Sequence, residues 1–199
     1  MADNSPDMVG VPVTNRGTWM QLRGGRRFYP LDPRADEVFI EDIAHSLSRQ
    51  IRYNGLSDLD VSVGQHSVNA AWIADIEGYH AGVQLAALMH DAPETYVADM
   101  VRPLKVEFPD YRALEDTVAT VIWERFNLPV IDHKLIKYFD NLCLSWEKRD
   151  MYWSAEEWPN MLDVPEYCPT MTTWSPDYTK ARFLNLFRWL MLEVEFTNG

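Results

Sequence analysis

Apolar residues along most of the chain recur three and four positions apart, the spacing that places them on one face of an α-helix. The first such helix begins at about Ile40 and ends at Asn54-Gly55, a pair typical of a turn. A second opens at Ser62, with Gln65 three residues later as in a capping box. The same spacing predicts helices over 62–78, 80–89, 110–126, 132–153 and 177–194.

The N-terminal region has a different pattern. In "TWMQLRGGRRFYP" (18–30), two short apolar and aromatic runs flank Gly24-Gly25, which predicts a β-hairpin with a two-residue turn. Residues 1–17 show no such pattern, so we expect a flexible arm, followed by a single domain over 18–199. The fold class is therefore predicted to be all-α, a helical bundle with a small N-terminal β-hairpin.

Composition narrows the cellular setting and the ligand class. The first ten residues lack the features of a signal peptide, and no apolar run is long enough to span a membrane. The two cysteines have neither metal-type nor disulfide-type spacing, which fits a reducing cytoplasm. The formal net charge of −12 argues against DNA or RNA polymers as ligands, since their binding proteins usually carry a basic surface. A small anionic substrate remains compatible, because a cation and a few basic groups can override the global charge.

Ionisable residues gather in "LMHDAPETYVADM" (88–100), directly after an apolar run. His90, Asp91, Glu94 and Asp99 lie there, although burying an ionised group is costly unless something pairs with it. In a purely structural interpretation, Asp91 caps a helix, Pro93 lies in its first turn and Glu94 completes a capping box. In the other interpretation, these side chains hold a cation.

Two further polar residues lie in apolar surroundings. His66 occurs in "GQHSVNAAWIA", and Asp140 lies at the edge of an apolar stripe in "LIKYFDNLCLSW". A hydrogen-bonded core histidine and a salt-bridged aspartate are the simpler interpretations of these two. With His90 and Asp91, however, they give the order His…His-Asp…Asp, each member on or beside a predicted helix.

That order resembles the HD-domain phosphohydrolases, and more narrowly the bacterial HD-domain 5′-deoxynucleotidases and phage HD-domain dATP triphosphohydrolases. The resemblance covers roughly residues 40–150. Its most specific part is "HDAPETYVADMVRPLK" (90–105), in which Glu94, Asp99 and Lys105 follow His-Asp. "FYPLDPRADEVFIEDIAHSLSRQIRYNG" (28–55) also resembles the beginning of phage-encoded members. The implied fold is an HD-domain helical bundle.

The resemblance implies a metal site formed by four ligands. Two imidazoles and two carboxylates suit a divalent transition metal such as Co²⁺, Mn²⁺, Zn²⁺, Ni²⁺ or Fe²⁺, with additional Mg²⁺ for a triphosphate substrate. Glu94, one turn from His90, would orient or deprotonate a metal-bound water, and by resemblance Asp99 would support that water or the leaving group. The implied ligands are His66, His90, Asp91 and Asp140.

The resemblance also implies substrate contacts. Lys105 would contact phosphate, and Arg52-Tyr53 matches an Arg-Trp pair that contacts the nucleotide and its deoxyribose in the family. Here tyrosine replaces tryptophan, which leaves selectivity for the sugar open. The plain alternatives are a solvated helix end for Arg52 and a surface lysine for Lys105. The residues expected to be structural or solvated are His45, His80, His133, Lys148 and Arg149.

The leading hypothesis is therefore a phosphohydrolase that attacks the α-phosphorus of a deoxynucleotide. It would act as a dNTP triphosphohydrolase, with dATP as one candidate substrate, or as a dNMP 5′-nucleotidase. Two alternatives remain, a cyclic or signalling-nucleotide phosphodiesterase and a non-catalytic helical interaction module. The expected partners are a small deoxynucleotide and further copies of the chain in a homo-oligomer, without a membrane. If the chain is phage-encoded, the expected location is the cytoplasm of the host.

Overall fold

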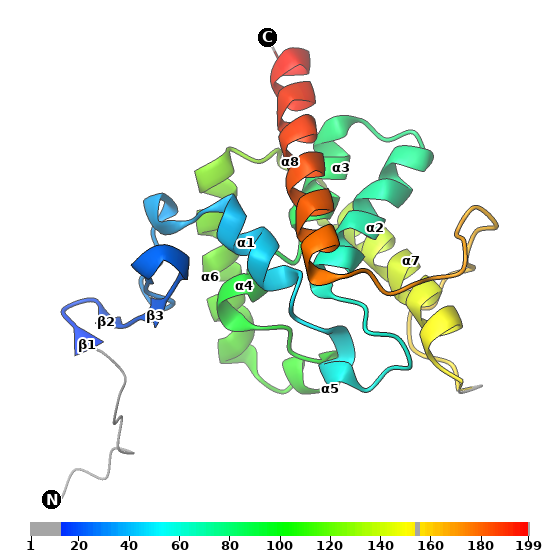
Figure 1. Cartoon of the computed structure of the whole chain (residues 1–199), viewed down its shortest axis with the longest axis horizontal. Coiled ribbons are helices and arrows are strands. Elements are labelled where there is room, and N and C mark those ends of the chain that lie inside the picture. The colour runs from blue at the N-terminus through cyan, green and yellow to red at the C-terminus, as the bar shows by residue number, and fades with distance from the viewer. Residues whose placement is uncertain (1–12, 154–155, 199) are drawn as a thin grey trace, which may run out of the picture.

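The computed structural model describes residues 13–153 and 156–198, and most of these are helical (Figure 1). The prediction of a mainly helical fold with a small antiparallel hairpin near the N-terminus is confirmed. No helix within the described ranges combines the length and apolarity needed to cross a membrane. The helices are α1 (Ile40–Leu47), α2 (Val63–Ile76), α3 (Ala81–Met89), α4 (Glu94–Val97), α5 (Arg102–Lys105), α6 (Pro109–Phe126), α7 (His133–Met151) and α8 (Pro176–Asn198).

The predicted hairpin is formed by β3 (Met20–Gln21) and β4 (Arg27–Phe28), which pair antiparallel. Its turn is longer than the two residues predicted, because a 3₁₀ turn, η1 (Arg23–Gly25), occupies it. Both glycines there have positive φ, and the N–H of Leu22 donates to the Arg26 carbonyl at 2.8 Å, closing a five-residue loop. The two-residue turn was therefore wrong, although the hairpin and its glycines were placed correctly.

A second ribbon precedes this hairpin. β1 (Val13–Thr14) pairs antiparallel with β2 (Gly17–Thr18), so residues 13–17 do not form the loose arm that was expected. Arg16, at the turn, donates to Asp32 and Glu37 at 2.5 Å each, which fastens the ribbon to the loop before α1. Residues 1–12 of the expected arm lie outside the described residues.

The first predicted helix ends seven residues early, at Leu47. Ile51 does not continue the helix and forms an isolated antiparallel bridge with Ser62. The N–H of Arg52 donates to the Val61 carbonyl at 3.0 Å, and a 3₁₀ turn, η3 (Arg52–Gly55), follows. The pairing of this segment with the strand-like residues before α2 turns the Arg52 side chain inward, instead of leaving it at a solvated helix end.

Helix α2 is central to the bundle and is buried along most of its length. Ser62 caps it by accepting from the Gln65 N–H at 3.2 Å, as predicted. The reciprocal half of the capping box is absent, because the Gln65 side chain donates to the Thr172 carbonyl and accepts from the Trp174 N–H. These bonds hold the segment before α8 against α2. Helices α3, α7 and α8 pack around α2, and His66, His90 and Asp140 lie together where α2, α3 and α7 meet.

Candidate metal centre

His66 lies in the first half of α2 and is completely buried. Its Nδ1 is 2.7 Å from Oε1 of Glu147, a carboxylate on α7. Its Nε2 has no hydrogen-bond partner and faces two other carboxylates, with Asp140 Oδ1 at 3.3 Å and Asp91 Oδ2 at 3.7 Å. The carboxylate of Glu147 accepts a hydrogen bond, so the neutral ring carries its proton on Nδ1 and leaves a lone pair on Nε2.

His90 lies at the C-terminal end of α3, and its ring is oriented in the same way. Its Nδ1 is 2.7 Å from the carbonyl oxygen of Ala87, which can only accept, so Nδ1 carries the proton. The Nε2 atom is buried without a hydrogen-bond partner, 3.2 Å from Asp91 Oδ2 and 3.9 Å from Asp140 Oδ1. Two imidazole nitrogens without hydrogen-bond partners therefore face the same pair of carboxylates.

These four side chains fit a metal ion. Ligand atoms of His66, His90 and Asp140 lie within 4.8 Å of one another and could hold an ion, and Asp91 Oδ2 approaches the same two nitrogens. A buried nitrogen without a partner is costly, and a metal bond would satisfy both at once. A second ring nitrogen held by a carbonyl or carboxylate is the usual support of a metal-binding histidine. Two nitrogens and two carboxylates are typical of a divalent transition metal.

The simpler structural interpretations account for only part of this geometry. The Asp91 side chain does not cap α4, whose N-cap is Pro93 without a side-chain bond, and the Glu94 N–H donates to the Asp91 carbonyl instead. The capping-box interpretation is therefore wrong. A salt bridge to a basic residue of a neighbouring helix, suggested for Asp140, is present only as a long contact of Oδ2 with Arg102 on α5 at 3.8 Å. The closer partner of Oδ2 is Lys137 on the same helix. The other oxygen, Oδ1, faces the two histidines.

The electrostatic balance of the cluster favours anionic aspartates. Burial alone would raise the pKa of Asp91 and of Asp140, but the neighbouring histidines outweigh it and hold both below their ordinary value. Burial and nearby Arg52 would lower the pKa of His66, but Glu147 and Asp140 outweigh them and raise it to about 9. Without an ion, His66 thus retains a proton in the place where a cation would bind.

Glu94 lies beside the four side chains at the start of α4, and it is buried. Its Oε2 has no hydrogen-bond partner, and its Oε1 is 3.8 Å from Nζ of Lys105. Burial, followed by the charges of Asp91 and Asp99, raises the pKa of Glu94 well above its ordinary value. Lys105 is half-buried and also donates to Glu115 at 2.6 Å, so it is not a plain surface lysine.

Asp99 follows a strained residue. Ala98 has φ 69° and ψ 161°, a conformation that residues other than glycine rarely adopt. Gln50 holds this segment in place, since its Oε1 accepts from the Asp99 N–H at 3.1 Å and its Nε2 donates to the Glu94 carbonyl at 3.0 Å. Burial raises the pKa of Asp99, which lies close enough to Asp91 for their charges to interact. Gln50 thus positions the backbone of both acids, a role that the sequence did not suggest.

The Arg52-Tyr53 pair faces the cluster from η3. The buried Arg52 donates from Nε to Glu147 Oε2 at 3.0 Å, and its Nη1 is 3.6 Å from Asp91 Oδ2. The Tyr53 hydroxyl donates to the same Glu147 oxygen. Burial and the Glu147 carboxylate raise the pKa of Tyr53, so its hydroxyl stays protonated and remains a donor. Both side chains therefore lie within one or two contacts of the four clustered side chains.

Glu147 is the main residue of the site that sequence reasoning missed. It is wholly buried and joins His66, Arg52 and Tyr53. Burial would raise its pKa, but Arg52 and His66 outweigh this and lower it, so the carboxylate is charged. A signal was present, because Glu147 follows Asp140 by seven residues, two helical turns, and lies next to Trp146 of the apolar stripe.

The remaining histidines lie outside the cluster, as expected. His80 caps α3 by accepting from the Gly82 N–H at 3.2 Å, and His133 is exposed at the start of α7. His45 is half-buried on α1. Arg149 is exposed, as expected, and it also pairs with Asp150 and donates to the Pro169 carbonyl at 2.9 Å.

Comparison with known proteins gives relatives whose function is uncharacterized. No family model matches the chain. Protein YfdR of Escherichia coli is 35% identical over 149 residues, which cover 74% of this chain and 81% of YfdR. Protein RCAP_rcc00048 of Rhodobacter capsulatus is 37% identical over 118 residues, which cover 57% of this chain and 60% of that protein. The name of neither relative states an activity, so the functional argument rests on the geometry of the cluster.

Proposed function

This chain belongs to the family of the Escherichia coli protein YfdR, and we propose that it is an HD-domain phosphohydrolase that cleaves the 5′-phosphate ester of deoxynucleotides. The observation that carries the proposal is the convergence of two buried Nε2 atoms, neither with a hydrogen-bond partner, with two anionic aspartates. The ligands are His66, His90, Asp91 and Asp140, in the order that resembles HD-domain enzymes.

The reaction is the attack of water on the α-phosphorus, with release of the 5′-oxygen as the deoxynucleoside hydroxyl. A bound divalent ion would supply a water of lowered pKa and polarise a phosphoryl oxygen. Glu94 has a buried oxygen without a hydrogen-bond partner beside the cluster, so as a carboxylate it would take the proton of the attacking water and return it to the leaving 5′-oxygen. Asp99 would orient the same water or leaving group from the segment that Gln50 holds.

Cationic side chains would bind the anionic substrate in this acidic protein. Arg52 lies 3.6 Å from Asp91, and Lys105 lies 3.8 Å from Glu94, so both reach the edge of the metal cluster. Each would exchange part of its carboxylate contact for a phosphate oxygen and stabilise the charge that grows during transfer. Tyr53 would lie against the deoxyribose and leave no room for a 2′-hydroxyl.

The substrate is a deoxynucleoside monophosphate or triphosphate, since both offer the same bond at the α-phosphorus. A monophosphate would yield inorganic phosphate and a triphosphate, for example dATP, would yield tripolyphosphate. The two free, buried cysteines, Cys143 and Cys168, support a reducing cytoplasmic setting.

The decisive experiment combines metal analysis with product identification. Metal-stripped protein is reloaded separately with Mn²⁺, Co²⁺, Ni²⁺, Zn²⁺, Fe²⁺ or Mg²⁺ and incubated with dNMPs, dNTPs, ribonucleotides and cyclic nucleotides. We expect about one transition-metal ion per chain and a deoxynucleoside as one product. His90→Ala should lose both, whereas His133→Ala, which replaces an exposed histidine outside the cluster, should keep both.

Three results would overturn the proposal. Absence of bound metal together with absence of hydrolysis would favour a non-catalytic helical module. Turnover of cyclic nucleotides alone would reassign the substrate class. Full activity of metal-free His90→Ala would separate the cluster from the chemistry.

A further inference from the structure

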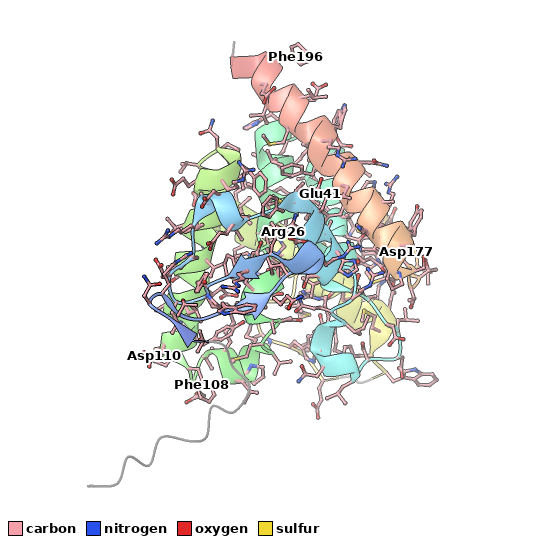
Figure 2. All side chains as sticks on the ribbon, turned by 60° about the vertical axis from the view of Figure 1, so that its left-hand side comes forward. Arg26, Glu41, Phe108, Asp110, Asp177 and Phe196 are labelled. Carbon is pink, nitrogen blue, oxygen red and sulfur yellow. The ribbon has the colours of Figure 1, made fainter. Side chains whose placement is uncertain are left out.

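Helix α8 carries an apolar stripe that the rest of the described chain does not cover. Trp189, Leu192 and Phe196 are 47%, 53% and 80% exposed, whereas Phe183 and Leu190 on the opposite face are buried in the core. The helix runs along the outside of the bundle, and its C-terminal turns rise beyond the neighbouring helices (Figure 1). Figure 2 shows Phe196 at this end, clear of the other helices.

The spacing of the stripe is that of a helix-pairing seam. Asn185, Trp189, Leu192 and Phe196 follow one another at intervals of four, three and four residues, as the inner positions of a coiled coil do. A contiguous row of large apolar side chains exposed to water costs free energy, which a second apolar surface would recover. Three anchors in this spacing match another helix better than they match a flat surface or a small ligand.

We propose that this stripe is a homodimer interface, in which α8 of one copy packs antiparallel against α8 of a second copy. In this arrangement the twofold axis passes between residues 190 and 191. Trp189 of each copy then packs against Leu192 of the other, and Phe196 of each lies over Asn185 of the other. Such an interface is self-complementary, as a twofold axis requires.

Charge complementarity favours a second copy in this orientation. Arg188 and Glu195 flank the stripe on the same side, seven residues apart. In the antiparallel register, Arg188 of each copy lies beside Glu195 of the other, which gives two ion pairs. In a parallel register these two side chains would lie two helical turns apart and could not pair. Among residues 13–153 and 156–198, Arg188 forms one loose ion pair, 3.6 Å to Glu41, and both side chains are more than half exposed.

The size of the stripe indicates a weak dimer. From their exposed fractions, the three apolar side chains would bury roughly 400 Å² per copy, about half of the ~800 Å² per partner in a standard interface. We therefore expect dissociation in the micromolar range and a mass that depends on protein concentration. None of these residues belongs to the metal centre, so this inference stands or falls separately from the proposed function.

Sedimentation of the full chain from about 1 to 200 μM tests the interface. We expect wild type to shift from the 23.1 kDa monomer towards twice that mass, and Leu192→Glu to stay monomeric throughout. Leu31→Glu is the matched control, because Leu31 is 75% exposed but lies in the loop after β4. Circular dichroism of each variant checks that the helices remain folded.

Charge exchange distinguishes a second copy from any other occupant. Arg188→Glu and Glu195→Arg should each weaken the dimer at least tenfold, because each places like charges together twice. An equimolar mixture of the two variants should form a heterodimer with wild-type affinity, since both of its ion pairs then have opposite charges. The double variant should form a homodimer with wild-type affinity for the same reason. A wild type that stays monomeric up to 200 μM would refute the interface and leave the stripe to a different partner. A dimer that is insensitive to Leu192→Glu, or a mixture without recovery, would also refute it.

Discussion

Glu147 offers the sharpest test of how the proposed metal centre is organised. Its Oε1 accepts from His66 Nδ1, while its Oε2 accepts from Arg52 and Tyr53. Glu147→Gln keeps the size of the side chain but replaces one acceptor oxygen by an NH₂ donor. If the amide oxygen stays with the two donors on η3, the NH₂ group faces His66 and forces its proton onto Nε2. The nitrogen that should bind the metal then has no lone pair.

Two separate losses follow from this change. Metal affinity should fall about 10–100-fold, the usual effect of removing the group that orients a ligand. Stability without metal should fall by about 3–5 kcal/mol, because Arg52 remains buried and loses its nearest countercharge. The remaining contact of Arg52 with Asp91, at 3.6 Å, favours the lower end of that range.

The measurements are metal titration by calorimetry and urea unfolding of metal-free protein. Tyr53→Phe is the matched control, since it removes one bond to the same oxygen and leaves the charge and the His66 tautomer unchanged. It should cost about 1 kcal/mol of stability and leave metal affinity within twofold of wild type. Unchanged metal affinity in Glu147→Gln would refute the idea that Glu147 sets the tautomer of His66.

Three further variants test the surroundings of the cluster. Glu94→Gln should retain the metal, as measured by elemental analysis. Its kcat should fall about 10²–10⁴-fold, because the amide cannot take the proton of the attacking water. A kcat within twofold of wild type would show that Glu94 takes no part in the chemistry. Wild type should prefer dAMP over AMP, or dATP over ATP, at least ~10-fold in kcat/KM, about 1.4 kcal/mol, and Tyr53→Ala should narrow this ratio at unchanged metal content. Equal values for both sugars in wild type would show that Tyr53 does not select deoxyribose. Ala98→Gly should stabilise the protein by about 1 kcal/mol in urea unfolding, since glycine adopts φ 69° without strain, whereas a loss of stability would show that the backbone there is unstrained.

The sequence by itself determined five of the helices and part of the residue cluster. Apolar spacing of three and four residues is a local property, so α2, α3, α6, α7 and α8 lie close to their predicted ranges. Residues near one another in sequence stay near one another in space, so His90, Asp91 and Glu94 could be grouped before the fold was known. His66 and Asp140 could be added to this group only because their order matches a family motif. The number of residues between two helices does not give the distance between them in space.

Tertiary structure decided the features that depend on pairing between distant segments. Ile51 continues the helical spacing of α1, but its bridge to Ser62 competes with the helix and prevails, which turns Arg52 inward. A buried carboxylate such as Glu147 cannot be told from a surface one by its neighbours in sequence, because its partners lie 81–95 residues away. Gln50 likewise reaches Asp99 across 49 residues. Long-range hydrogen bonds such as these also determine which ring nitrogen of His66 faces the cluster. They form only when the helices pack together.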